Sequence, residues 1–207
     1  MYNYYMIIPA RRIEGELKTH NVSNIVGIDE VGRGCLAGPV VAAAVILQDN
    51  TNIPLLRDSK KLSKLQRNRA ELDIKQQSPA IGIGWVSAAE VDQWGLSWAV
   101  KQSGLRALAD LGLQPGFVIL DGNHNYLNGT QYSSKAYVGA DATESCVAAA
   151  SIIAKCARDN YMELAAKAHP GYGFERHVGY GTAEHKMALK EHGVTALHRK
   201  SFAGVVS

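Results

Sequence analysis

Cysteine is scarce in this 207-residue chain, which has only Cys35, Cys146 and Cys156. So small and odd a set fits neither a disulfide framework nor a zinc motif, and we expect a reducing, cytoplasmic compartment. No apolar run reaches membrane-spanning length, the nearest being "VAAASIIA" (147–154). The first residues also lack the charged start of a signal peptide. We therefore expect a protein that does not enter a membrane.

Net charge is also small, at +3, so charge alone does not identify a polyanionic partner. Lys and Arg outnumber Asp and Glu from Lys155 onward, and five of the seven histidines fall there. The length suits one compact domain. We expect an N-terminal lead-in (1–24), a catalytic core (25–168) and a C-terminal helical segment packed on the core (169–207).

Strand and helix patterns alternate along the chain and predict an α/β fold. The early strands follow one another closely, which indicates a mixed, partly antiparallel sheet of five strands flanked by helices. An interior glycine is expected to divide one helix, and Asp58 or Ser59 to cap another. The predicted strands lie in 25–30, 40–47, 80–87, 116–127 (ending at Asp121) and 131–141, and the predicted helices in 11–20, 58–77, 88–112, 143–169 and 182–193.

Carboxylates stand at or just beyond the ends of three predicted strands: Asp29, Asp121 and Asp141, with Glu30 beside the first. Several carboxylates in one cleft raise each other's pKa unless a cation neutralises them. Mg²⁺ accepts such oxygen ligands, and two ions about 3.5–4 Å apart can assist phosphoryl transfer. Because neighbouring strand residues point to opposite faces, Asp29 and Glu30 can share a site only if the strand ends or twists there.

Three other features have both a functional and an ordinary interpretation. Gly32-Arg33-Gly34 allows close backbone approach to a ligand, or is simply a tight turn; its spacing fits neither a dinucleotide nor a Walker motif. Tyr180, between two glycines, can meet a sugar or base, or be a packed aromatic. The basic strip formed by residues 59–64 with Arg67 and Arg69 can contact phosphate, or be a solvated helix face.

Two further groups are given no catalytic role. The histidines are too irregularly spaced for a persuasive zinc site, although we expect His177 and His185 to line the same cleft. Asp159 is expected to pair on the surface with Arg158 or Lys155, outside the site.

Six motifs occur in an order that resembles the prokaryotic ribonuclease HII family. They are "GIDEVGRGCLAGPVVAAAVIL", "DSKKLS", "VILDGNH", "AAASIIAKCARD", "GYGT" and "LHRKSF". The resemblance covers about residues 25–202. It implies a ribonuclease H-like fold and a metal-dependent endonuclease, with Mg²⁺ or Mn²⁺ and two ions as cofactor. The implied substrates are RNA–DNA hybrids and duplex DNA carrying single ribonucleotides, cut on the 5′ side to leave 3′-hydroxyl and 5′-phosphate ends.

The resemblance also assigns residues. It implies that the four carboxylates are catalytic and hold the metals, with Asp29 and Asp121 bridging one ion. It implies that Gly32, Arg33 and Gly34 read the ribose 2′-hydroxyl with help from Tyr180, and that Lys60 contacts phosphate. The chain departs from the family's pattern at Cys35, where proline is frequent, and at Gly139, where lysine is usual. Nothing in the sequence demands more than a monomer.

Three other functions are considered. A resolvase or other nuclease on the same fold would cut DNA without regard to ribose. A ribonuclease of the HIII type would be expected to carry an additional N-terminal domain, for which the 24-residue lead-in leaves no room. A nucleic-acid binder without catalysis would have no reason to place four acids at strand ends, since carboxylates repel phosphates.

Overall fold

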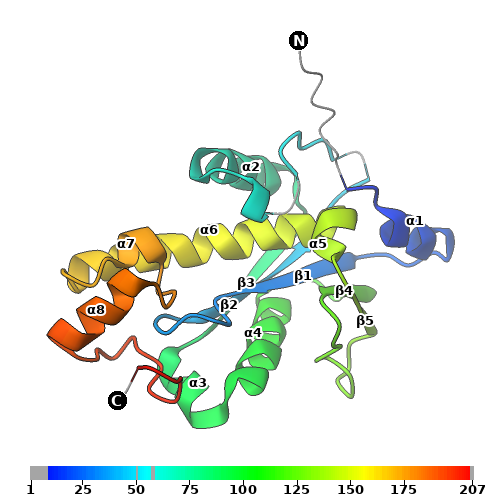
Figure 1. Ribbon diagram of the computed structural model, residues 1–207. Coiled ribbons are helices and arrows are strands. Elements are labelled where there is room, and N and C mark those ends of the chain that lie inside the picture. Colours follow the sequence, from blue (N-terminus) through cyan, green and yellow to red (C-terminus); the bar gives the residue numbers. More distant parts are fainter. Residues whose placement is uncertain (1–8, 50, 57–58, 206–207) are drawn as a thin grey trace.

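A single mixed sheet forms the centre of the protein, seen in a computed structural model that describes residues 9–49, 51–56 and 59–205 (Figure 1). The strand order is β3-β2-β1-β4-β5. β2 is antiparallel to both β1 and β3, whereas β4 and β5 run parallel to β1. The predicted mixed five-stranded sheet is thereby confirmed. The strands are β1 (Ile25–Val31), β2 (Val40–Ile46), β3 (Ala80–Val86), β4 (Phe117–Asp121) and β5 (Ser134–Tyr137).

Helices cover both faces of this sheet. Neighbouring residues of β2 point to opposite faces of the sheet. Ala43 packs against α6 and α2, whereas Ala42 packs against α4. Two glycines let helix backbones approach closely: an added Cβ would lie 2.3 Å from the α6 backbone at Gly27 and 1.9 Å from the α4 backbone at Gly84. The helices are α1 (Arg12–Thr19), α2 (Lys64–Gln77), α3 (Ala88–Trp94), α4 (Leu96–Asp110), α5 (Ala140–Thr143), α6 (Ser145–Ala168), α7 (Phe174–His177) and α8 (Ala183–His192), with a 3-10 turn, η1, at Ser59–Lys61.

The largest difference from the expected helix ends is at the start of α2. The helix predicted from residue 58 begins later, at Lys64, because Ser63 accepts from the Gln66 N–H and Gln66 returns a bond in a capping box. Ser59 therefore lies in η1 and is not the cap, and Asp58 lies outside the described residues. The expected break within 88–112 is confirmed at Gly95, whose φ of +83° separates α3 from α4.

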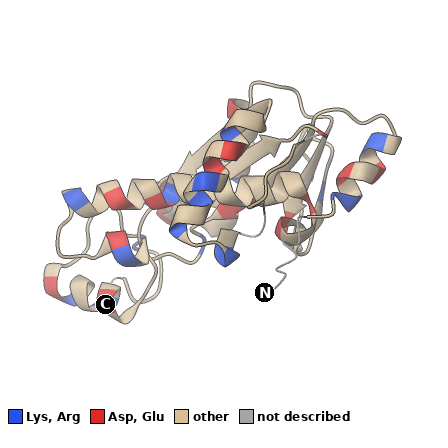
Figure 2. Cartoon of the chain, turned by 90° about the horizontal axis from the view of Figure 1, so that it is seen from above, with Lys and Arg blue, Asp and Glu red and all other residues tan. Residues whose placement is uncertain are grey.

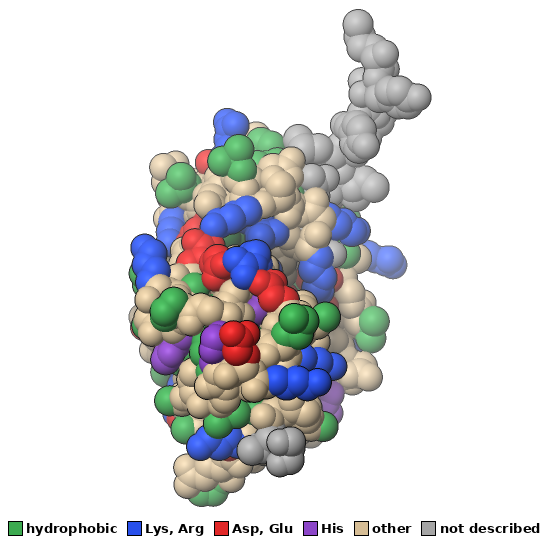
Figure 3. All heavy atoms as spheres, turned by 60° about the vertical axis from the view of Figure 1, so that its left-hand side comes forward, with side chains coloured by type: hydrophobic (Ala, Val, Ile, Leu, Met, Phe, Trp, Pro, Cys, Tyr) green, Lys and Arg blue, Asp and Glu red, His purple; other side chains and the backbone are tan. Residues whose placement is uncertain are grey.

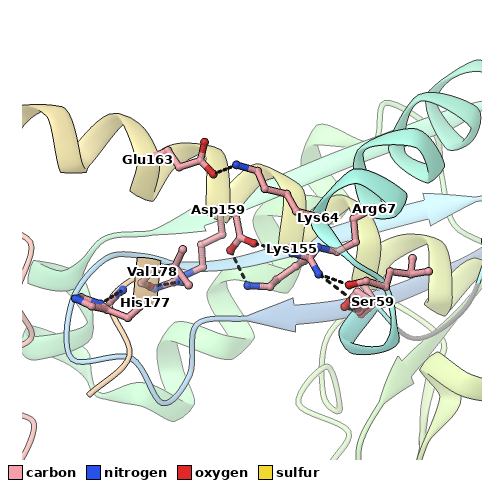
Figure 4. Close-up of polar contacts among 12 residues, drawn as sticks. Ser59, Lys64, Arg67, Lys155, Asp159, Glu163, His177 and Val178 are labelled. Atoms are coloured by element: carbon pink, nitrogen blue, oxygen red, sulfur yellow. Dashed lines mark hydrogen bonds and ion pairs between the residues drawn. The ribbon is translucent and has the colours of Figure 1, made fainter. Parts of the chain in front are cut away.

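Ion pairs connect α2 to α6. Figure 4 shows Asp159 between Lys155, at 2.6 Å, and Arg67, at 3.5 Å, and Lys64 pairs with Glu163 nearby. Figure 2 shows both acidic and basic residues along α6. The basic strip is thus partly neutralised by α6. None of the described helices combines the length and apolar character needed to cross a bilayer.

The C-terminal segment is bonded to the loop between β1 and β2. On one side of this loop, the Leu36 N–H donates to Gly179 O at 2.9 Å. On the other, the Gly38 N–H donates to Leu197 O at 2.8 Å. The loop residues therefore lie between two stretches of the C-terminal segment, which places α7 and α8 beside the end of β1 (Figure 1).

Candidate active site

The last residues of β1 carry the first two acids of the candidate site. Asp29 pairs with Ala43 and Glu30 with Ala42 in the β2 register, so both still belong to the sheet. The Glu30 N–H donates to Asp29 Oδ1 at 2.8 Å. The Ser151 hydroxyl on α6 hydrogen-bonds to Asp29 and is itself 2.9 Å from the Ser59 hydroxyl. Asp29 therefore faces α6, whereas Glu30 borders a cavity lined by residues of α4, so the two acids lie on opposite faces of β1. Both still lie close enough to Asp121 for its carboxylate to raise their pKa values.

Asp29 is only 9% exposed, and its environment disfavours a negative charge. Burial raises the pKa of Asp29 to about 8, and the neighbouring Glu30 and Asp121 carboxylates contribute to the rise. Hydrogen bonds from Ser151 and the Glu30 backbone oppose it only in part. A carboxyl held in this way takes up a proton or a cation near neutral pH.

The two carboxylate oxygens of Glu30 have different surroundings. The Arg33 guanidinium donates to Oε1 at 3.0 Å. Oε2 is buried and has no hydrogen-bond partner among the described residues. Burial raises the pKa of Glu30 and Arg33 opposes that rise. This buried oxygen is of the type that a divalent cation accepts as a ligand.

Asp121 and Asp141 complete the acidic group from neighbouring elements. Asp121 ends β4, which is parallel to β1, so its carboxylate lies beside the end of that strand. The Asp141 N–H donates to Asp121 Oδ1 at 3.4 Å. Contrary to the sequence prediction, Asp141 does not end a strand: β5 stops at Tyr137 and Asp141 lies in the first turn of α5. The left-handed Gly139 (φ +72°) begins that turn.

Lys60 lies beside the acidic group, where a phosphate of a bound substrate could reach it. Its Nζ is 3.6 Å from Asp141 Oδ2, and the side chain is 77% exposed. A cavity of about 500 Å³ opens on the other side, bordered by Glu30, Arg33, Asp121 and Lys101. Acidic side chains gather near the middle of the face that includes the C-terminal segment, among Lys and Arg side chains (Figure 3).

The Gly32–Gly34 turn has two glycines that serve different needs. Gly32 has φ +93°, and an added Cβ would lie 2.5 Å from Arg158 Nε and 2.6 Å from Pro39 O. An added Cβ at Gly34 would meet no atom of the described residues within 4 Å. Folding therefore demands glycine at the first position but not at the second, which fronts open space beside the acids.

Tyr180 lies against the same turn. It forms an isolated antiparallel bridge with Cys35, directly after Gly34. The Tyr180 side chain is 41% exposed. The structure thus brings the Gly-Arg-Gly turn and the tyrosine together, although 146 positions separate Gly34 from Tyr180.

The donor set suits hydrated divalent ions better than a closed metal cage. Within residues 9–49, 51–56 and 59–205, no group of three or more His, Cys, Asp or Glu side chains is arranged to hold an ion by itself. Mg²⁺ keeps several waters and is usually bound through one or two carboxylates. The unpaired Glu30 Oε2 and the raised pKa of Asp29 are the features that such ions would relieve.

Two buried arginines were missed by sequence reasoning. Arg158, expected on the surface beside Asp159, is fully buried and donates to the carbonyls of Pro39, Ala37 and Val178. Arg199 is also fully buried and donates to Gly38 O and Arg33 O. Their only sequence signal was arginine within the short motifs "AKCARD" and "LHRKSF".

A family model described as Ribonuclease HII matches residues 26–205. The chain is 44% identical to the ribonuclease HII of Geobacillus thermodenitrificans and 44% identical to one from Bacillus cereus. Both alignments cover 94% of this chain and 74% of the relative.

The chain belongs to the ribonuclease HII family. The resemblance inferred from the motifs is thereby confirmed, as is the expectation of a metal-dependent hydrolase of the ribonuclease H type.

Solved structures agree with the fold. A ribonuclease H2 from Pyrococcus horikoshii has a TM-score of 0.77 at 23% identity, covering 87% of this chain and 94% of that one. A ribonuclease HII from Archaeoglobus fulgidus, solved in complex with PCNA, has a TM-score of 0.74 at 26% identity, covering 86% and 94%. A Bst-RNase HIII solved with Mn²⁺ has a TM-score of 0.67 at 22% identity, covering 91% and 70%. The ribonuclease H-like fold is thereby confirmed.

Proposed function

We propose that this ribonuclease cuts RNA in RNA–DNA hybrids and incises duplex DNA on the 5′ side of single embedded ribonucleotides, leaving 3′-hydroxyl and 5′-phosphate ends. The observation that carries the proposal is one continuous site. Asp29, Glu30 and Asp121 lie at the ends of adjacent parallel strands, and the Gly32–Gly34 turn with Tyr180 lies directly beyond them. A cutting group and a ribose-reading group are therefore neighbours.

The four carboxylates are assigned to metal binding. Asp29, Glu30, Asp121 and Asp141 would hold Mg²⁺ or Mn²⁺ ions. Two bound ions would lower the pKa of an attacking water and stabilise the charge on the leaving oxygen. Lys60, exposed beside Asp141, is assigned to a phosphate of the substrate.

Ribose recognition is assigned to the turn and the tyrosine. Gly34 leaves space in front of its backbone, where a sugar can approach without meeting a side chain. The Tyr180 side chain is partly exposed, and its residue is bridged to Cys35, directly after Gly34. A 2′-hydroxyl both donates and accepts hydrogen bonds, and this is how a protein distinguishes RNA from DNA at one position.

The deciding experiment uses an end-labelled DNA duplex with one ribonucleotide and a matched all-DNA duplex. We expect a single cut on the 5′ side of the ribonucleotide with Mg²⁺ or Mn²⁺, no cut in the control, and loss of the cut with chelator. Equal cutting of the all-DNA duplex would refute the ribose-reading assignment. Cutting of long hybrids alone would remove the single-ribonucleotide activity from the proposal.

Gly34→Ala tests the open space in front of the turn. Because the new methyl group meets no protein atom, we expect an unchanged melting temperature and a KM for the ribonucleotide duplex raised about tenfold or more. Gly32→Ala is the matched comparison. Its methyl group would strike Pro39 O and Arg158, so it should destabilise folding by roughly 2–4 kcal/mol. An unchanged KM for Gly34→Ala would remove this position from the binding site.

A further inference from the structure

A chain of buried hydrogen bonds runs through two histidines to the backbone of Tyr180. The Thr195 N–H donates to His198 Nδ1 at 2.9 Å. His198 Nε2 lies 3.1 Å from His185 Nε2. His185 Nδ1 lies 2.9 Å from Tyr180 O. His185 is fully buried and His198 is 2% exposed, so neither ring touches a substrate.

The partners at the two ends determine where the protons are. A backbone N–H can only donate, so His198 Nδ1 is an acceptor and its proton sits on Nε2. A carbonyl can only accept, so His185 Nδ1 carries a proton and its Nε2 has a lone pair. The two central nitrogens therefore form one Nε2–H···Nε2 bond, and both ends of the chain require the same pair of tautomers.

Both rings are held neutral by their surroundings. Burial lowers the pKa of His198 to about 4, and the nearby His185 contributes. Burial also lowers the pKa of His185. Because the two Nε2 atoms share one proton, neither presents a lone pair to a metal ion. These histidines, whose spacing argued against a zinc site, therefore form a network of hydrogen bonds.

His177 hydrogen-bonds to the backbone of Gly179, the residue before Tyr180. The Gly179 N–H donates to His177 Nδ1 at 3.2 Å, and His177 Nε2 lies 2.8 Å from Tyr172 O. The rings of His177 and His185 stack with centroids 4.5 Å apart. We expected these two histidines to line one cleft. Instead they form a buried, stacked pair next to the loop that carries Tyr180.

We infer that His185 and His198 are positioning residues for ribose recognition: they orient the Tyr180 peptide so that its side chain stands beside the Gly32–Gly34 turn. This inference rests on the proposed function, because it assumes that Tyr180 meets the substrate. His185 supplies the bond to Tyr180, and His198 fixes the tautomer of His185 that makes this bond possible.

Amide substitutions separate the two nitrogens of His185. Asparagine places its amide near the Nδ1 position and can still donate to Tyr180 O, whereas glutamine reaches the Nε2 position and leaves that carbonyl without its donor. We expect His185→Leu and His185→Gln to raise KM for the single-ribonucleotide duplex roughly tenfold, and His185→Asn to restore it to within about threefold of wild type. His192→Asn, at the exposed end of the same helix, is the control and should leave KM unchanged.

Two further measurements distinguish positioning from general stability. In ¹⁵N-histidine NMR spectra of the whole protein, we expect His185 protonated at Nδ1 and His198 at Nε2; the opposite tautomer of either would overturn the inference. The double variant His185→Leu/Tyr180→Ala should bind no more weakly than Tyr180→Ala alone. Additive losses would show that His185 does not act through Tyr180, while a harmless Tyr180→Ala would refute the inference by removing the tyrosine from the proposed function.

Discussion

Asp29→Asn is expected to abolish cleavage while making the metal-free protein more stable. Loss of a charge assigned to metal binding should lower kcat about 10³-fold or more, equivalent to several kcal/mol of transition-state stabilisation. The amide has nearly the same shape as the carboxyl group but carries no charge to bury. Asp29 is buried beside Glu30 and Asp121, so the folded protein gains from this neutralisation.

The sign of the stability effect follows from the raised pKa. Between the unfolded value near 4 and the folded value of about 8, the unfolded chain releases a proton that the folded protein retains. Rising pH therefore destabilises the wild-type fold across this window. The asparagine variant lacks this penalty, so its advantage should grow from pH 4 to pH 8 and reach roughly 2–3 kcal/mol, after a discount for solvent relaxation.

Chelator-treated wild type and variant should be melted across this pH range, with kcat measured in Mg²⁺ and Mn²⁺. Asp73→Asn, in α2 and outside the acidic group, is the control and should change neither quantity. Near-normal turnover of Asp29→Asn would refute its catalytic assignment. An advantage that shrinks with rising pH would contradict the buried, protonated carboxyl.

The combination of acids and an arginine at the end of β1 has a physical explanation. Asp29 and Glu30 oppose a phosphate backbone, yet Arg33 pairs with Glu30 and bound ions would reverse the remaining charge. The glycines that follow bring the chain back toward the C-terminal segment. One short stretch can therefore belong both to a metal site and to a substrate-binding turn.

Local patterns were sufficient to predict the sheet and most helices. The β-branched run of β2 and the small-residue run of α6 form as expected, because each can bury its apolar surface only in that form. Asp29 and Asp121 could be proposed as neighbours because parallel strands end at the same edge of a sheet. The same argument misplaced Asp141, whose position depends on the glycine turn before α5.

The parts that sequence reasoning missed depend on contacts between distant segments. Nothing local distinguishes Arg199, which donates to the turn at Gly38 and Arg33, from an exposed arginine such as Arg176. His185 and His198 likewise acquire their roles only when α8 packs near the final loop. Buried polar groups of this kind need partners from elsewhere in the chain, which spacing along the sequence does not reveal.

Arg199→Lys is expected to lower the free energy of unfolding by about 3 kcal/mol, or about 6–12 °C in melting temperature. The guanidinium makes three hydrogen bonds, two to Gly38 O and one to Arg33 O, at 2.9–3.1 Å. An ammonium group cannot reproduce this planar fork, and at least one buried carbonyl would lose its donor. Burial already lowers the pKa of Arg199 to about 10, and a lysine in its place would be still less able to remain charged.

Arg176→Lys is the matched control, because this arginine is exposed and pairs with Glu175 and Glu184 at the surface. Surface pairs of this kind contribute little, so the melting temperature should be essentially unchanged. Because Arg199 holds the carbonyl of Arg33, its lysine variant should also raise KM for the single-ribonucleotide duplex, at temperatures where the protein is still folded. If Arg199→Lys has the melting temperature of the wild type, the backbone contacts of the β1–β2 loop are sufficient to hold this loop in place without the guanidinium. A stability loss without a change in KM would separate the fold of the C-terminal segment from substrate recognition.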